Sequence, residues 1–378
     1  MSKLPYITSA MLTVTHRCNL RCRYCFVHQG PQDMTLDTAI AAAEFLIRNA
    51  KPSNSIPEIN FFGGEPLLTF DEIIKPLVEW AHNARGEKFK FSITTNGTLL
   101  TDSRIQFMRK HGFGVLFSMD GIKPMQDYNR PDAAGNGTFA RLKEIVPKII
   151  LAWPNTTFRM TALPETCHYV YDSALWAAAQ GFKSFFVIPD VFREWPQESR
   201  ETLRREVKKY AAYYFRSKAK NEKPILFSSF EQALLDVGLI RAANEAGEFR
   251  ASPKCKSSGK CGLGASRFAA IHPDGSLYAC QEMTSNDGAE SAFYIGNIFD
   301  GVDDERRRAL MAEYDSAPAR GDSCETCPYN RICDGGCVAN NYLITGKLNS
   351  LPEVYCWWKR TLLEAAGGEH NGGLYDKL

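Results

Sequence analysis

Apolar runs alternate with amphipathic stretches between residues 10 and 218, and this alternation limits the possible folds more than any other feature of the chain. The apolar runs, predicted to be strands, lie at 10–15, 58–62, 89–94, 115–119, 157–162 and 184–188. The amphipathic stretches, predicted to be helices, lie at 36–49, 70–83, 102–110, 139–150, 169–180 and 200–218. Six strand–helix units in series predict a parallel sheet with right-handed crossovers. Because eight units close a complete barrel, we predict an α/β fold: a partial (β/α)6 barrel, TIM-like but open on one side.

The pattern changes after residue 223, where long periodic elements give way to a region richer in Gly, Ser and Cys. A hairpin is predicted from the runs at 268–271 and 276–279, which flank the turn sequence Pro273-Asp274-Gly275. We therefore predict a partial barrel over residues 1–225, a bridge over 226–254, a small cysteine-rich α+β domain over 255–365 and a polar tail over 366–378.

The 12 cysteines are unevenly spread. Three lie between Cys18 and Cys25, eight lie between Cys255 and Cys356, and Cys167 stands alone. A cytosolic chain keeps its thiols reduced, so the two groups indicate metal sites rather than disulfides. Cys167 is interpreted as a small buried hydrophobe, and His16, beside the first group, as a packing or hydrogen-bonding residue.

Charge and hydropathy exclude several classes of partner. Lys and Arg total 45 against 43 Asp and Glu, which gives no reason to expect binding to nucleic acid or to an anionic membrane. The first 15 residues lack the features of a signal peptide. No run approaches the roughly 20 apolar residues that span a bilayer. We expect a cytoplasmic protein with neither nucleic acid nor membrane as a partner.

The first cysteine group, Cys18-Asn-Leu-Arg-Cys22-Arg-Tyr-Cys25, directly follows the first predicted strand. Barrel folds carry their active sites in such loops, at the carboxyl ends of strands. Three thiolates can hold three irons of a four-iron cluster and leave the fourth iron open. S-adenosylmethionine (SAM) can fill that position, and an electron from the cluster then cleaves it to a 5′-deoxyadenosyl radical. A zinc site remains an alternative for this spacing alone.

Further motifs follow later strands in order: Gly63-Gly64-Glu65-Pro66, Thr95-Asn96-Gly97 and Ser118-Met119-Asp120-Gly121, and then Asn129-Arg130-Pro131-Asp132. Together with the Cys-x3-Cys-x2-Cys spacing they resemble the radical SAM enzymes. In that family a Gly-Gly-Glu-Pro motif binds the SAM amino group and an arginine pairs with its carboxylate. The resemblance implies SAM contacts from Tyr24, Gly63, Gly64, Glu65, Pro66, Asn96, Ser118 and Arg130. Taken singly, each motif also fits an ordinary turn.

The second cysteine group resembles the SPASM domain, the auxiliary-cluster extension of peptide-modifying radical SAM enzymes. It contains eight thiols, the number that two fully ligated four-iron clusters need. The resemblance implies that Cys255, Cys261, Cys280 and Cys337 hold the nearer cluster, and that Cys324, Cys327, Cys333 and Cys356 hold the farther one. With Cys18, Cys22 and Cys25, the expected cofactors are three [4Fe-4S] clusters and SAM. A zinc ribbon on Cys324, Cys327, Cys333 and Cys337 is the alternative, but it leaves four cysteines unexplained.

The leading functional hypothesis is a maturase that forms an oxidative cross-link, with a thioether favoured, in a ribosomally made peptide. The sequences Phe61-Phe62-Gly-Gly-Glu-Pro-Leu-Leu and Cys22-Arg-Tyr-Cys25-Phe26 look most like those of thioether-forming maturases. The expected partners are a peptide or protein substrate and a small reductant protein of the flavodoxin or ferredoxin type. Many such maturases carry a leader-binding domain before the barrel. Here the barrel is predicted to start within the first dozen residues, so a separate leader-binding protein, or the barrel and bridge themselves, would hold the leader.

Two alternatives belong to other classes. An anaerobic sulfatase-maturating enzyme, which converts Cys or Ser to formylglycine, suits the chain's length and the Cys255-x5-Cys261 spacing. That family places an aspartate, the proposed base, directly after the cysteine matching Cys280, whereas this chain has Gln281, which cannot accept a proton at neutral pH. The side chain of Glu282 is expected to point elsewhere. A non-catalytic iron–sulfur electron carrier is the other alternative, but it gives the SAM motifs no use. Glu282, Asp190 and Asp120 are candidate proton acceptors, and each also fits a turn or surface carboxylate.

Overall fold

The computed structural model describes residues 4–83, 88–245, 267–284, 288–316, 324, 327, 329, 333 and 335–367. Its strands are β1 (Ser9–Thr15), β2 (Glu58–Gly63), β3 (Lys90–Thr95), β4 (Gly114–Ser118), β5 (Thr157–Ala162), β6 (Ser184–Pro189), β7 (Leu226–Phe227), β8 (Phe268–Ile271), β9 (Ser276–Tyr278), β10 (Tyr294–Asn297) and β11 (Gly301–Val302). Its α-helices are α1 (Leu36–Ala50), α2 (Lys75–Asn83), α3 (Asp102–Lys110), α4 (Lys123–Asn129), α5 (Phe139–Ala152), α6 (Val170–Gln180), α7 (Gln197–Ala219), α8 (Ser228–Glu245), α9 (Asp304–Ser316), α10 (Val338–Thr345) and α11 (Glu353–Ala365).

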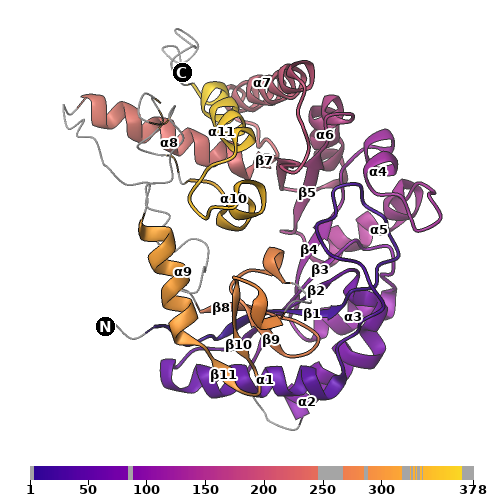
Figure 1. Ribbon diagram of the computed structural model, residues 1–378. Helices are drawn as coiled ribbons and strands as arrows, with labels where there is room; N and C mark the ends of the chain where they lie inside the picture. The colour runs from indigo at the N-terminus through magenta and orange to yellow at the C-terminus, as the bar shows by residue number, and fades with distance from the viewer. Residues whose placement is uncertain are drawn as a thin grey trace.

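The described strands form one open sheet in the order β11-β10-β9-β8-β1-β2-β3-β4-β5-β6-β7. Strands β1 to β7 are parallel to their neighbours, as the strand–helix alternation predicted. Each of the six predicted strands is confirmed to within one residue at either end. The helices that follow them lie on the outer side of the sheet (Figure 1). The α/β fold with a partial, open barrel is therefore confirmed.

The predicted hairpin is confirmed as β8 and β9, and the structure shows where it lies. Strand β8 pairs in parallel with β1, with Leu12 opposite Ile271, so the cysteine-rich region extends the barrel sheet along its first edge. Strands β9 to β11 continue the sheet in antiparallel fashion. The predicted domain limits remain predictions, since the sheet itself runs across them.

Buried apolar side chains explain why these segments fold as they do. Strands β2, β5 and β6 alternate strictly between buried and partly exposed residues. Helix α1 begins at the cap residue Thr35, whose side chain accepts a hydrogen bond from the backbone N–H of Thr38, and it buries seven residues along one face. Cys167 is 1% exposed, which confirms its interpretation as a buried hydrophobe. Within the described part of the chain, no helix combines the length and the apolar character needed to cross a membrane.

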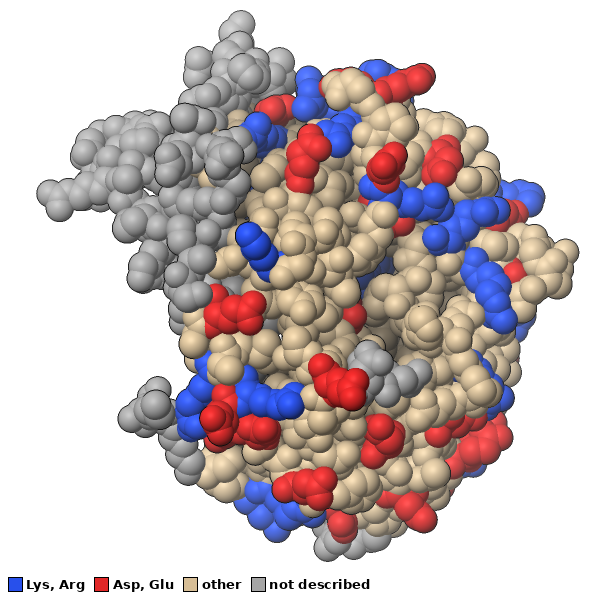
Figure 2. All heavy atoms as spheres, in the orientation of Figure 1, with Lys and Arg blue, Asp and Glu red and all other residues tan. Residues whose placement is uncertain are grey.

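Helices α10 and α11 bring the end of the chain back to the barrel. Helix α11 packs against α7 and α8, and an ion pair joins Arg200 of α7 to Glu353 of α11 at 2.5 Å. Figure 1 shows α10 and α11 beside these two helices, facing the strand ends of the barrel. Figure 2 shows that charged residues of both signs are interspersed over this face, which is hollowed near its centre.

Candidate functional site

One cavity gathers most of the residues that the sequence singled out. It is lined at the carboxyl ends of β2 to β6, by the loop after β1, and by two residues from the cysteine-rich region, Glu282 and Asn340. Among the predicted site residues, those that line it are Cys18, Cys22, Tyr24, Cys25, Gly63, Gly64, Asn96, Ser118 and Arg130. Glu65 and Pro66 lie behind this wall and are fully or almost fully buried. The first cysteine group and the later motifs therefore meet in one place, as their positions after successive strands predicted.

The cysteine loop is held by backbone hydrogen bonds to the segment that carries Arg130. The N–H of Arg21 donates to the carbonyl of Pro131 at 2.8 Å, and the N–H of Arg23 donates to the carbonyl of Asn129 at 2.9 Å. These bonds place the guanidinium of Arg130 next to the loop, where its Nη1 lies 3.7 Å from Sγ of Cys22. A cation is therefore fixed beside one of the three thiols.

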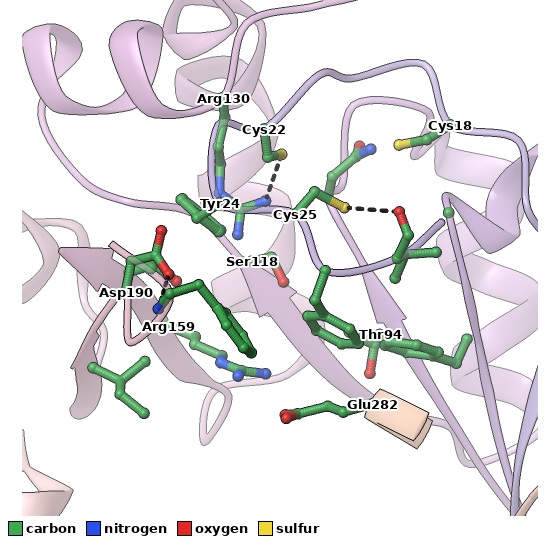
Figure 3. Close-up of a pocket in the computed structure, with 18 of the residues that line it drawn as sticks. Cys18, Cys22, Tyr24, Cys25, Thr94, Ser118, Arg130, Arg159, Asp190 and Glu282 are labelled. Carbon is green, nitrogen blue, oxygen red and sulfur yellow. Dashed lines mark hydrogen bonds between the residues drawn. The ribbon is translucent and has the colours of Figure 1, made fainter. Parts of the chain in front are cut away.

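All three thiols of this loop are free and face the cavity (Figure 3). Burial raises the pKa of Cys18 to about 11 and that of Cys22 to about 12, with Arg130 opposing the rise. Iron binds the thiolate, so loading the site must release these protons. Three free thiols beside an open cavity fit a four-iron cluster that keeps one iron accessible.

Glycines 63 and 64 are required by the packing of the backbone. A Cβ at Gly63, whose φ is +133°, would lie 2.1 Å from the carbonyl oxygen of Thr15, and a Cβ at Gly64 would lie 2.1 Å from that of Arg17. The N–H of Gly64 donates to the Thr15 carbonyl at 2.8 Å. The resemblance implied SAM contacts from these two glycines, and the structure shows that they let β2 approach the cysteine loop.

The carboxylate of Glu65 is engaged by the protein itself. It accepts hydrogen bonds from Thr95 Oγ1 at 2.7 Å, from the N–H of Asn96 at 2.8 Å and from the N–H of Leu67 at 3.1 Å. Burial raises its pKa to about 7 in spite of these donors. Because Glu65 caps the turn after β2 and ties it to the end of β3, its side chain positions the loops that line the cavity.

A buried network supports Arg130. Asp120, which is 0% exposed, accepts hydrogen bonds from Tyr24 Oη at 2.7 Å, from Arg130 Nε at 3.2 Å and from the N–H of Thr161 at 2.9 Å. The guanidinium of Arg130 also lies 5.2 Å from the centre of the Tyr24 ring. Both carboxylate oxygens of Asp120 accept hydrogen bonds, and Asp120 does not line the cavity. It therefore holds Arg130 and Tyr24 in place, whereas the sequence indicated a candidate proton acceptor.

The two other candidate proton acceptors, Asp190 and Glu282, both line the cavity. Burial raises the pKa of each carboxyl. The expectation that the Glu282 side chain points away from the site is wrong. A single helical turn over Gln281–Met283 follows Cys280, so successive side chains project in different directions. Met283 enters the core, and Glu282 projects into the cavity (Figure 3).

Six cysteines of the second group lie among the described residues: Cys280, Cys324, Cys327, Cys333, Cys337 and Cys356. Burial, together with the nearby thiols of Cys324, Cys333 and Cys327, raises the pKa of Cys356 to about 11. Cys337 Sγ lies 4.0 Å from an oxygen of Glu282, two residues beyond Cys280. These contacts are compatible with the two ligand sets that the SPASM resemblance implied, and those sets stay a prediction. Cys255 and Cys261 lie outside the described residues.

Within the part of the chain that the structure describes, no three His, Cys, Asp or Glu side chains are close enough together to bind one metal ion. A four-iron cluster is larger than a single ion and spaces its thiolates more widely.

Sequence reasoning missed several of the residues that line the cavity, among them Arg159, Phe192 and Asn340. Arg159 lies on β5 between two fully buried residues, Phe158 and Met160. A charge at such a position was the one available signal, because a strand in the middle of a sheet rarely carries a charge without a reason. The other two lie on a loop and a helix that no motif marks.

Comparison with known proteins adds to this geometry. The family description "Radical SAM superfamily" matches residues 12–177. A serine-type anaerobic sulfatase-maturating enzyme of Klebsiella aerogenes is 27% identical over 341 residues, which cover 85% of this chain and 77% of the relative. The structure "Native anSMEcpe with bound AdoMet and Cp18Cys peptide" superposes with a TM-score of 0.73 at 22% identity, over 95% of this chain and 96% of that chain. Streptococcus suis SuiB bound to precursor peptide SuiA gives a TM-score of 0.60 at 15% identity, over 92% of this chain and 75% of that chain.

Proposed function

Since this chain belongs to the radical SAM superfamily and has the fold of its SPASM-type maturases, we propose that it oxidises a residue within a peptide or protein substrate. The observation that carries this proposal is the shared cavity. One wall bears the three free thiols of Cys18, Cys22 and Cys25, and the other bears Glu282 and Asn340 of the cysteine-rich region. A substrate in this cavity would touch both regions at once.

The first wall supplies the groups for SAM. The thiolates of Cys18, Cys22 and Cys25 would hold a four-iron cluster with one iron open to SAM, and the group would supply a 5′-deoxyadenosyl radical able to take a hydrogen atom from the substrate. Arg130, fixed by Asp120, would pair with the SAM carboxylate. The cavity-lining residues Tyr24, Asn96 and Ser118 would contact the rest of SAM, and Glu65 would hold the loop that presents Gly63 and Gly64.

The second wall supplies the route for oxidation. After hydrogen abstraction, the substrate radical must lose one electron and one proton to give a two-electron oxidised product. We propose that Cys255, Cys261, Cys280 and Cys337 would hold a nearer auxiliary four-iron cluster, and Cys324, Cys327, Cys333 and Cys356 a farther one. Such clusters would supply an acceptor for that electron. A small flavodoxin- or ferredoxin-type protein would reduce the first cluster before each turnover.

The first candidate product is formylglycine. Its support is the extent of the similarity to the Klebsiella sulfatase-maturating enzyme, which reaches well beyond the barrel into the cysteine-rich region. The main objection at the level of sequence was Gln281 in place of an aspartate. A carboxylate is nevertheless available to the cavity, because Glu282 projects into it.

The second candidate product is an oxidative cross-link, such as a thioether, within a ribosomally made peptide. Gln281 favours it, since the residue expected for formylglycine formation is replaced there. The fold is also similar to that of SuiB, a protein whose structure was solved with a precursor peptide. If the substrate carries a leader segment, a separate leader-binding protein is a possible partner.

The test is an anaerobic incubation of the reduced, cluster-loaded enzyme with SAM and two sets of peptides: peptides encoded beside its gene, and sulfatase-derived peptides containing Cys or Ser. We expect 5′-deoxyadenosine together with an oxidised peptide. An aldehyde that reacts with a hydrazide indicates formylglycine, whereas a loss of two hydrogens without aldehyde indicates a cross-link.

The matched control is a Cys22→Ala variant, which should form no 5′-deoxyadenosine. If fully loaded wild-type enzyme also forms none with any peptide, the proposal is wrong and the electron-carrier alternative gains. Glu65→Ala tests the role of the Gly-Gly-Glu-Pro motif, because unchanged SAM binding would show that the motif is not needed there.

A further inference from the structure

Two opposite charges, Arg159 of β5 and Glu282, line the same part of the cavity and have no role in the proposed SAM contacts. Figure 3 shows their charged ends pointing toward one another below Ser118. They come from separate regions of the chain, the barrel and the cysteine-rich region. The cavity therefore ends in a cation on one side and a carboxyl group on the other.

The two charges do not satisfy one another directly. Among the residues that the structure describes, the Arg159 side chain makes no hydrogen bond and no direct ion pair. Among the same described residues, the one hydrogen-bond contact of Glu282 is with the thiol of Cys337, which lies 4.0 Å from its Oε2. That thiol ceases to be a donor once it is a thiolate. Both groups are thus partly desolvated without the partners that such groups require.

A ligand group that fits between them must be neutral overall and polar at both ends. A carboxylate would be attracted by Arg159 but repelled by Glu282, and an ammonium would meet the reverse conflict. A trans peptide amide carries its carbonyl and its N–H on opposite sides of one plane. It can therefore accept from the guanidinium on one side and donate to the carboxylate on the other.

We propose that Arg159 and Glu282 together hold a backbone amide of the substrate peptide, with Arg159 donating to the carbonyl oxygen and Glu282 accepting from the N–H. This inference rests on the proposed function, since it names the group that the enzyme recognises. It places the anchored residue between the loop of Cys18, Cys22 and Cys25 and the thiol of Cys337. A primary carboxamide from an Asn or Gln side chain has related chemistry, but it presents its donor and acceptor at one edge and spans the gap less well.

The test measures binding of small probes, so that it does not depend on turnover. The full chain, loaded with its clusters in the oxidised state and with SAM, is titrated with four probes by saturation-transfer NMR. The probes are N-acetylalanine N-methylamide, N-acetylalanine, alanine N-methylamide and propionamide, which present a neutral diamide, a carboxylate, an ammonium and a primary carboxamide. We expect the neutral diamide to bind most tightly. If propionamide binds as tightly, the proposal of a backbone amide is wrong.

Variants then separate recognition from structure. Glu282→Met and Arg159→Met should each weaken diamide binding about tenfold or more, because each loses a hydrogen bond to a charged group. Glu282→Met should at the same time favour the carboxylate probe, and Arg159→Met the ammonium probe. Glu282→Gln, which keeps an acceptor oxygen, should retain more diamide affinity than Glu282→Met. Arg193→Gln is the matched control, because Arg193 is a cation near the cavity that does not line it.

Equal loss of all four probes in both Met variants, or an unchanged order of probes, would overturn the inference. Iron content measured for each variant shows whether its clusters remain intact. The outcome also separates this inference from the proposed function. Correct probe selectivity without any 5′-deoxyadenosine would reject the function and leave the amide site, whereas normal peptide oxidation with unaltered selectivity in the variants would reject the amide site alone.

Discussion

Asp120→Asn is expected to lower both the stability of the protein and its affinity for SAM. Asp120 is 0% exposed and accepts three hydrogen bonds, of which those from Tyr24 and Arg130 involve the same oxygen. Removing one partner of a buried ion pair costs about 3–5 kcal/mol, because the remaining charge stays buried and uncompensated. Asparagine keeps one acceptor oxygen, so we expect a loss of unfolding free energy at the lower end, about 3 kcal/mol.

The assay is urea unfolding under anaerobic conditions, followed by circular dichroism, for Asp120→Asn and two comparison variants. Tyr24→Phe removes one hydrogen bond to the charged group and should cost about 1.5–3 kcal/mol. Glu58→Gln breaks the 2.7 Å ion pair with Lys90, in which both side chains are largely exposed. It should lower the unfolding free energy by about 0–1 kcal/mol. These variants set the scale for a buried and an exposed carboxylate in the same barrel.

The SAM dissociation constant, measured by equilibrium dialysis on the loaded enzyme, tests the second half of the prediction. Asp120→Asn leaves Arg130 without its anchor, so SAM binding should weaken by about tenfold or more, as for the loss of a charge-assisted hydrogen bond. A stability change no larger than that of Glu58→Gln would refute the argument from burial. Unchanged SAM affinity in a clearly destabilised Asp120→Asn protein would refute the argument that Asp120 positions Arg130.

Three further predictions follow from other parts of the structure. Gly64→Ala should abolish 5′-deoxyadenosine formation and lower the melting temperature, since its Cβ would collide with a backbone carbonyl at 2.1 Å. Cys356→Ala should lower the iron content by about four irons, which is one cluster, and SAM cleavage should be retained. Equal loss of iron from all clusters would contradict the proposal that Cys324, Cys327, Cys333 and Cys356 hold one separate cluster. The ring of His272 lowers the pKa of Asp274 to about 2. The depressed pKa contributes stability that is present above about pH 4 and is lost as the pH falls through 2. Because Asp274 is half exposed, this contribution is discounted to about 1 kcal/mol. Asp274→Asn should therefore flatten the acid limb of the stability profile measured by urea unfolding, and an unchanged limb would exclude this source.

The barrel could be predicted closely because its strands have a simple sequence signature. Strands near the middle of a parallel sheet are buried and appear as short apolar runs between amphipathic helices. The same signature says nothing about edges, so the pairing of β8 with β1 could not be predicted. Helix α4 was missed because it has only seven residues. Helix α8, which the sequence placed in a bridge without long periodic elements, was missed because its apolar residues do not gather on one face.

Some residues of the candidate site could likewise be predicted from the sequence, and others could not. Cys18, Cys22 and Cys25 are close together in the sequence, so their spacing predicted the group that lines the cavity. Arg159 and Glu282 are far apart in the sequence, and only the folded chain makes them neighbours. For Glu65 the sequence left two alternatives, a ligand contact and a turn. The structure supports the turn, because the Glu65 carboxylate accepts three hydrogen bonds from within the protein. A contact between SAM and the backbone of the motif stays a prediction.

The pairing of β1 with β8 explains how two distant cysteine regions can share one cavity. Strand β1 leads directly into the loop of Cys18, and the hairpin of β8 and β9 leads directly into Cys280. Because the register places Leu12 opposite Ile271, both fully buried, sliding one strand past the other would expose core residues. The contact continues at the ends of the two strands, where the rings of His16 and His272 lie 5.1 Å apart. The position of Glu282 relative to the cysteine loop is therefore set by the sheet itself, through the pairing of β1 with β8.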